Sequence, residues 1–97
     1  MLILKTVARG GPQHGFEIAS AILRGSQDVL RVEEGSLYPA LQRMLLKGWL
    51  SGEWGKTADN RRARYYKVTR AGQQQLAQEL ERYQRVSVAI ARILEPA

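Results

Sequence analysis

Cysteine is absent from the sequence, and histidine occurs only once, at His14. Without cysteine the chain can form no disulfide, no thiolate metal site and no cysteine nucleophile. A single histidine cannot build a metal site alone, so we expect neither a metal nor another cofactor. We expect His14 to act structurally, as a hydrogen-bonding group at the start of a helix. The lack of cysteine also fits a cytoplasmic protein.

Long apolar segments are missing as well. No run approaches the ~20 apolar residues that span a bilayer, so we expect no membrane segment. The apolar start, residues 1–7, lacks a basic leader and a small-residue cleavage site, and we do not expect a signal peptide. A chain of 97 residues makes one domain with a small core. Further burial across a dimer interface would stabilise it.

Positive charge, in contrast, is in excess. The chain carries 15 Lys and Arg against 9 Asp and Glu, a formal net charge of +6. Residues 49–70 hold six basic and two acidic residues, which is four of the six excess charges, whereas residues 71–97 are balanced. Such a concentrated basic segment is typical of a surface that binds a phosphate-rich partner. The alternative is a solvated surface without a partner.

Three helices are predicted in the first half of the chain. Ser36 is expected to cap the third of them. Pro39 then falls in its first turn, where the missing N–H costs no helical hydrogen bond. Gly48 is expected to end this helix. Apolar residues at helical spacing place the three helices at about residues 2–8, 14–23 and 36–47.

The spacing then changes. β-forming residues predict strands at Trp49–Trp54 and Tyr65–Thr69, joined by a polar nine-residue loop, Gly55–Ala63, and a long helix at Ala71–Leu94. Three helices and a hairpin with a basic loop form a winged helix-turn-helix, whose third helix enters the major groove. We therefore predict a mainly α protein with a small β-hairpin. Residues 1–70 would be the winged helix-turn-helix and residues 71–97 a dimerisation helix, in one compact unit.

The polar face of the third helix and the basic loop form the candidate DNA-binding site. Gln42 can pair with adenine and Arg43 with guanine, while Ser36 and Tyr38 can bond phosphate oxygens. For the helix alone, an ordinary solvated face is an equally good interpretation. The loop favours function, because three arginines in four residues would repel one another without an anion. The residues assigned to this site are Ser36, Tyr38, Gln42, Arg43, Lys47, Lys56, Asn60, Arg61, Arg62 and Arg64.

The last helix carries a heptad-like apolar seam with one polar interruption. On a monomer this seam would be a continuous exposed stripe, which soluble monomers avoid. We predict that it pairs with the same helix of a second chain and with the apolar first segment. The residues assigned to this dimer interface are Leu2, Leu4, Leu76, Leu80, Tyr83, Ser87, Ile90 and Leu94.

Four stretches of the chain form a characteristic pattern: LILK at residues 2–5, HGFEI at 14–18, RVEEGSLYPAL at 31–41, and EWG at 53–55 leading into NRRARYY at 60–66 and Thr69. Through these stretches the chain resembles, over nearly its whole length, the PadR family of bacterial transcriptional regulators. Its single C-terminal helix is similar to that of the short subclass. The resemblance implies a homodimer that represses transcription at a palindromic operator in double-stranded DNA, with a basic wing. It places Pro39 on the recognition helix beside Ser36, Tyr38 and Gln42.

Some members of this family release DNA when they bind phenolic acids or flat drugs at the dimer interface, which makes a small aromatic effector a candidate partner. This chain departs from the family pattern at Phe16, where tyrosine is more usual, and at Trp49, where a smaller aliphatic residue is common. Its last helix contains no tryptophan on which a drug could stack. That departure counts against a multidrug pocket.

Two other function classes fit the sequence less well. A winged-helix module that binds proteins rather than DNA would carry a neutral or acidic third helix and loop, the reverse of what is present. An enzyme would need a convergent set of polar residues, and the sequence suggests none.

Overall fold

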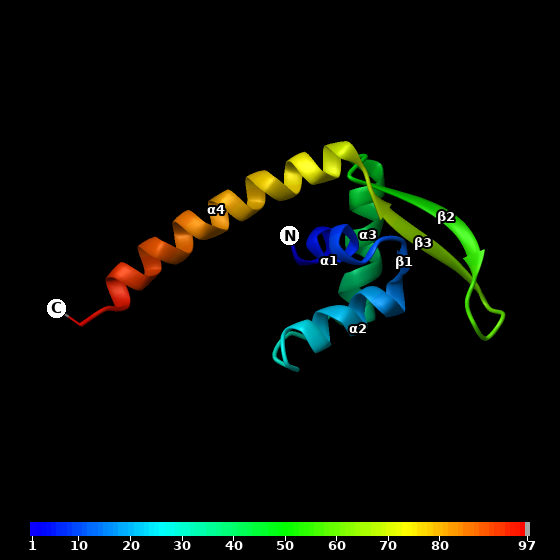
Figure 1. Cartoon of the computed structure of the whole chain (residues 1–97), viewed down its shortest axis with the longest axis horizontal. Helices are drawn as coiled ribbons and strands as arrows, with labels where there is room; N and C mark the ends of the chain where they lie inside the picture. Colours follow the sequence, from blue (N-terminus) through cyan, green and yellow to red (C-terminus); the bar gives the residue numbers. More distant parts are fainter. Residues whose placement is uncertain (97) are drawn as a thin grey trace.

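The structure, a computed structural model, describes residues 1–96. Three helices are followed by a long hairpin and a long terminal helix, the order that the sequence predicts, and a short strand was not anticipated (Figure 1). The elements are α1 (Leu2–Gly10), β1 (Gln13–His14), α2 (Gly15–Gly25), α3 (Glu34–Leu46), β2 (Leu50–Lys56), β3 (Arg62–Val68) and α4 (Arg70–Leu94).

A reciprocal cap fixes the start of α2. The backbone N–H of Glu17 donates to Nδ1 of His14 at 3.4 Å, and the backbone N–H of His14 donates to Oε1 of Glu17 at 3.1 Å. Each side chain thus satisfies a backbone donor that the first turn of a helix leaves free. The structural role predicted for His14 is confirmed.

The start of α3 differs from the prediction. The helix begins at Glu34, with Glu33 as N-cap, so Ser36 lies inside the first turn and does not cap it. Pro39 consequently falls in the second turn, where it has no N–H to donate to the carbonyl of Gly35. The predicted end is correct. Gly48 has φ +76°, and the backbone N–H groups that follow Lys47 turn back onto the last carbonyls of the helix.

The sheet is larger than the predicted hairpin. It has the order β1-β3-β2 and is antiparallel throughout, with Trp54 opposite Arg64 and Lys56 opposite Arg62. The strands β2 and β3 run further than expected, so the connecting loop shrinks from nine residues to residues 57–61. Strand β1 was missed because its two residues pair only with distant β3, at Tyr65 and Tyr66.

The core lies where α1, α2, α3 and the base of the sheet meet. Leu4, Ile18 and Leu41 are fully buried, and Leu37 is 1% exposed. Burying side chains of this size contributes about 1.5–3 kcal/mol each relative to exposure. Among the described residues, ten apolar side chains form the core: Ile3, Leu4, Val7, Ile18, Ile22, Leu37, Leu41, Leu50, Tyr66 and Leu76.

The first turn of α4 is fastened to the end of α3. The hydroxyl of Thr69 donates to the carbonyl of Gly48 and accepts from the backbone N–H of Gly72. Gly72 packs so closely that a Cβ at this position would collide with the carbonyl oxygen of Trp49. These short-range contacts set the direction in which α4 leaves the body of the protein.

The rest of α4 projects away from the body (Figure 1). Every residue from Glu81 to Pro96 is exposed in the single chain, which measures 58 Å along its longest axis. Within residues 1–96, no helix combines the length and apolar character needed to cross a membrane.

Candidate DNA-binding surface

The exposed side of α3 carries most of the predicted reading residues. Leu37 and Leu41 turn into the core, and the helical repeat therefore directs Tyr38 and Gln42, each one position further along, toward solvent. Exposed on this helix are Ser36, Tyr38, Pro39, Gln42 and Arg43. A solvent-facing helix with amide, guanidinium and hydroxyl groups can meet base edges and phosphates in a major groove.

Lys47 lies apart from that group. It follows the last residue of α3, and its ammonium sits 4.7 Å from the ring centroid of Trp49. The ammonium group that is predicted to contact DNA therefore already packs on the ring of Trp49.

The wing consists of β2, the loop of residues 57–61 and β3. Side chains alternate between the two faces of a strand, and the register sets Trp54, Lys56, Arg62 and Arg64 on the same face. That face continues the one on which Leu50 and Tyr66 are buried in the core. We call these four residues the wing face. It concentrates three positive charges on one face of the hairpin.

The strand positions of two arginines correct the prediction. Arg62 and Arg64 were expected on the loop, but both belong to β3, and only Asn60 and Arg61 remain on the loop. Asn60 adopts φ +63°, a left-handed conformation that asparagine tolerates in tight turns. Arg61 is paired with Asp59, its Nε lying 3.4 Å from a carboxylate oxygen.

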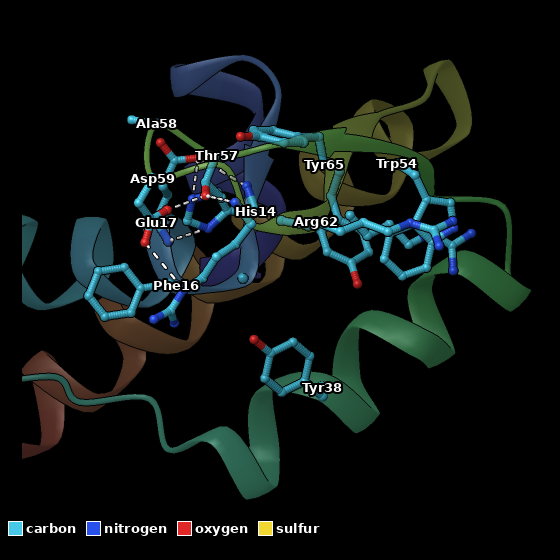
Figure 2. A pocket seen from close by; sticks show the side chains of 15 residues that line it. His14, Phe16, Glu17, Tyr38, Trp54, Thr57, Ala58, Asp59, Arg62 and Tyr65 are labelled. Atoms are coloured by element: carbon cyan, nitrogen blue, oxygen red, sulfur yellow. Dashed lines mark hydrogen bonds and ion pairs between the residues drawn. The ribbon is translucent and has the colours of Figure 1, made fainter.

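Tyr38 and the wing lie on opposite sides of a cleft. Figure 2 shows Tyr38 rising from α3 into the space that Trp54 and Arg62 border from the wing, with His14 and Phe16 at the start of α2 closing another side. The cleft has a volume of about 910 Å³. It brings together the predicted residues Tyr38, Arg61, Arg62 and Arg64, whereas Ser36, Pro39, Gln42, Arg43, Lys47, Lys56 and Asn60 lie outside its lining.

The charge of the cleft comes from its arginines and two carboxylates, while its buried phenol is uncharged. Burial raises the pKa of the Tyr66 phenol; the nearby Arg64 cation partly offsets this effect, and Tyr38 adds to it. Tyr66 is therefore a neutral group at physiological pH. Glu17 and Asp59 supply carboxylates to the cleft, and within residues 1–96 no three histidine or acidic side chains converge to hold a metal ion.

Trp54 is a site residue that the sequence did not assign. It is 60% exposed on the wing face, and the guanidinium carbon of Arg62 lies 4.5 Å from its ring centroid. The motif that contains it was visible in the sequence, but the strand register that sets Trp54 beside two arginines was not.

The predicted dimer residues divide into three groups by exposure. Leu4 and Leu76 are core residues, with 0% and 7% exposure, so they have little surface left for a partner, and the prediction was wrong in treating them as a free seam. Leu80 is partly buried against the core. The remaining assigned residues, Leu2, Tyr83, Ser87, Ile90 and Leu94, are exposed.

The comparisons with known proteins agree with this geometry. The model of the transcriptional regulator PadR-like family matches residues 3–78. An uncharacterised protein of Lysinibacillus sphaericus is 24% identical over 83 residues, covering 86% of this chain and 76% of the relative.

Solved structures share the fold over almost the whole chain. A transcriptional regulator from Clostridium thermocellum matches with a TM-score of 0.87 and 23% identity, covering 97% of this chain and 90% of the other. A PadR-like transcriptional regulator from Bacillus cereus matches with a TM-score of 0.81 and 24% identity, covering 98% and 89%. The predicted fold class, mainly α with a winged helix-turn-helix, is thereby confirmed. The chain belongs to the PadR-like family of transcriptional regulators, whose members are not enzymes.

Proposed function

We propose that this regulator is a repressor that binds a palindromic operator as a homodimer. The observation that carries the proposal is that Tyr38, on the exposed side of α3, shares one cleft with Arg62 and Arg64 of the wing face. The helix supplies groups that read bases, and the wing supplies cations that hold phosphates. A module that binds only proteins would not need this excess of positive charge.

In this proposal, α3 reads the sequence. Gln42 is exposed on the solvent side of the helix and can pair with adenine, while Arg43 can pair with guanine. Ser36, near the helix N-terminus, can bond a phosphate oxygen beside free backbone N–H groups.

Dimerisation would supply the second half of the operator. The distal half of α4, residues 81–94, carries exposed apolar residues at coiled-coil spacing, including Tyr83, Ile90 and Leu94. Pairing two copies of this helix would present two α3 helices to successive major grooves, about 34 Å apart on one face of the DNA.

We further infer that a small aromatic effector would release the DNA by binding between the paired helices. On the single chain, Val86, Ile90 and Ile93 line a shallow apolar hollow of about 310 Å³, which supports this inference. Since α4 contains no tryptophan, Tyr83 is the aromatic residue available for stacking. A regulator of chromosomal DNA would act in the bacterial cytoplasm.

The test is selection of bound sequences from a random pool of duplex DNA, followed by titration of the best site. We expect an inverted repeat with half-sites one helical turn apart. Gln42→Ala should weaken binding to that site by about 1–3 kcal/mol and weaken random DNA much less. Gln78→Ala, an exposed glutamine on α4, is the matched control. Failure to enrich any sequence, together with binding that does not respond to salt, would refute the proposal.

A further inference from the structure

The wing contains two groups of arginines in different surroundings. We infer that Trp54 is a positioning residue for DNA binding: its ring holds Arg62 and Arg64 ready to contact the phosphate backbone, while Arg61 at the tip of the wing contributes little. This inference rests on the proposed DNA binding and assigns the phosphate contacts to the strands of the wing rather than to its loop.

Trp54 is in contact with both strand arginines. The guanidinium carbon of Arg62 lies 4.5 Å from the ring centroid of Trp54, and that of Arg64 lies 5.9 Å from it. Arg64 is the direct cross-strand partner of Trp54, and Arg62 is its diagonal neighbour on the same face. Both distances fall within the ~6 Å range of a favourable cation–π interaction.

Gly52 provides the room that Arg64 needs. A Cβ at position 52 would lie 2.5 Å from Nε of Arg64, so the arginine side chain crosses β2 where that strand has no side chain. Nε of Arg64 is buried and has no hydrogen-bond partner within residues 1–96. The position of Arg64 is therefore set by packing against β2 and the Trp54 ring rather than by an ion pair.

The stacked arginines keep their full charge. Within the described residues, neither Arg62 nor Arg64 forms an ion pair with a carboxylate. A ring face attracts a guanidinium without neutralising it, and leaves its in-plane N–H groups able to meet a phosphate. A guanidinium that is already oriented loses less side-chain entropy on binding.

The tip of the wing is built differently. Arg61 is paired with Asp59, and the Asp59 carboxylate also accepts from the hydroxyl of Thr57. The backbone N–H of Arg61 donates to the same Thr57 oxygen at 3.1 Å. A phosphate that approaches Arg61 meets the negative charge of Asp59 as well, so the tip offers little net attraction. The wing face carries Lys56, Arg62 and Arg64 and no acidic residue.

The experiment compares Trp54→Leu, Trp54→Phe, Arg61→Ala, Arg62→Ala and Arg64→Ala in the full-length protein. The dissociation constant for a 30-base-pair duplex is measured over a salt series. Trp54→Leu keeps the charges but loses the ring, so binding should weaken by roughly 3- to 10-fold at each salt concentration, with the salt slope unchanged. Trp54→Phe keeps a ring face and should restore most of the affinity.

The arginine variants should behave differently from Trp54→Leu and from each other. Arg62→Ala and Arg64→Ala should each lower the salt slope by about one, since a phosphate contact is lost. Arg61→Ala should leave the slope close to that of the parent, since no phosphate contact is lost, and should lower the affinity less than Arg62→Ala does. A second measurement covers the case in which Trp54→Leu disturbs the fold: Arg62→Lys with Arg64→Lys keeps the charge but weakens the planar stack, and should lower affinity several-fold without changing the slope.

Each remaining outcome overturns the inference. Equal binding by Trp54→Leu and the parent removes the role of the ring, and equal losses in Trp54→Leu and Trp54→Phe show that stacking is not its basis. A loss in Arg61→Ala as large as that in Arg62→Ala returns the contacts to the loop. In all three cases the parent still binds DNA in a salt-dependent manner, whereas failure of the proposed function would appear as no such binding by the parent itself.

Discussion

Leu41 and Leu94 are residues of the same type, but they lie in two regions of the molecule with opposite surroundings. Leu41, in α3, is fully buried among α1, α2 and the sheet, whereas Leu94, at the end of α4, is 76% exposed. Both belong to apolar stripes with helical spacing. In the body, residues 1–80, the stripes of several helices face one another, while the distal half of α4 has no neighbouring element among residues 1–96.

This contrast shows that helical spacing of apolar residues identifies a face that must be covered but not what covers it. The apolar faces of the body pack against one another. In contrast, α4 packs on the body only with its first part, and its distal half extends away from it. Leu76 completes the core, Leu80 lies at its edge, and Ile90 and Ile93 extend beyond it with 52% and 84% exposure. Exposed apolar residues of this density on one helix are typical of an interaction surface.

The largest effect is expected in the distal half of α4, where a charged residue should dissociate the proposed helix pair. Ile90→Asp places a carboxylate at the centre of the proposed helix pair, where an unpaired buried charge costs about 3–5 kcal/mol. We expect the dimer dissociation constant to rise at least about 100-fold, with the monomer still folded because Ile90 is not in its core. Sedimentation velocity and circular dichroism measure the two properties.

Val88→Asp is the matched control for that change. Val88 is 51% exposed, comparable to Ile90, but lies on the opposite side of the helix. It should leave the dimer intact. If the parent sediments as a monomer at micromolar concentration, or if both variants dissociate equally, the distal half of α4 does not pair through this seam.

The next largest effect is expected when each of the two leucines is shortened to alanine. Leu41→Ala leaves a cavity in a closely packed core and should lower the free energy of unfolding by about 2–5 kcal/mol at any protein concentration. Leu94→Ala should act only through the dimer, so its destabilisation should disappear on dilution. Urea unfolding at two concentrations tests both expectations. A concentration-independent loss of similar size in Leu94→Ala would show that this residue packs within its own chain.

The sequence predicted the body well where the signal is local. The apolar spacing placed the helices, Gly48 marked the end of α3, and the residues around His14 indicated the start of α2. It failed at the start of α3, because Glu33 caps that helix without a side-chain hydrogen bond. It also failed at β1, which depends on pairing with a strand about 50 residues further along the chain.

The candidate site was predicted by residue type rather than by position. The excess of arginine near the hairpin was visible, but the strand ends were set too short, and Arg62 and Arg64 were therefore assigned to the loop. Strand pairing decided which side chains share a face, and that placed Trp54 beside the arginines. Nothing local in the sequence encodes such a register, because it depends on both strands.

A smaller effect is expected where the body meets α4. Gly72→Ala would bring a methyl group against the backbone carbonyl of Trp49, which cannot rotate away as a side chain could. We expect a loss of about 1–3 kcal/mol in stability and a change in the direction of α4, which should weaken operator binding more than nonspecific binding. Thermal unfolding and titration of both DNAs measure these changes. Gly35→Ala is the control, because the same methyl group at Gly35 of α3 would contact nothing within 4 Å. Equal stability of the two variants would show that the approach at Gly72 relaxes easily.

The smallest effect compares a tyrosine of the body with one of the distal helix. Burial raises the pKa of Tyr66, which is 7% exposed, so the unfolded chain releases this proton at a lower pH than the folded chain does. The folded state then binds more protons than the unfolded state, and stability must fall as the pH rises. The contribution is fully present below about pH 10, the ordinary value for tyrosine, and is lost as the pH rises from there through the higher folded pKa. Thermal unfolding between pH 8 and about pH 11 should therefore show a decline that Tyr66→Phe reduces and that Tyr83→Phe, at a 55% exposed position on α4, leaves in place. An equal reduction in both variants would show that the burial of Tyr66 is not the cause.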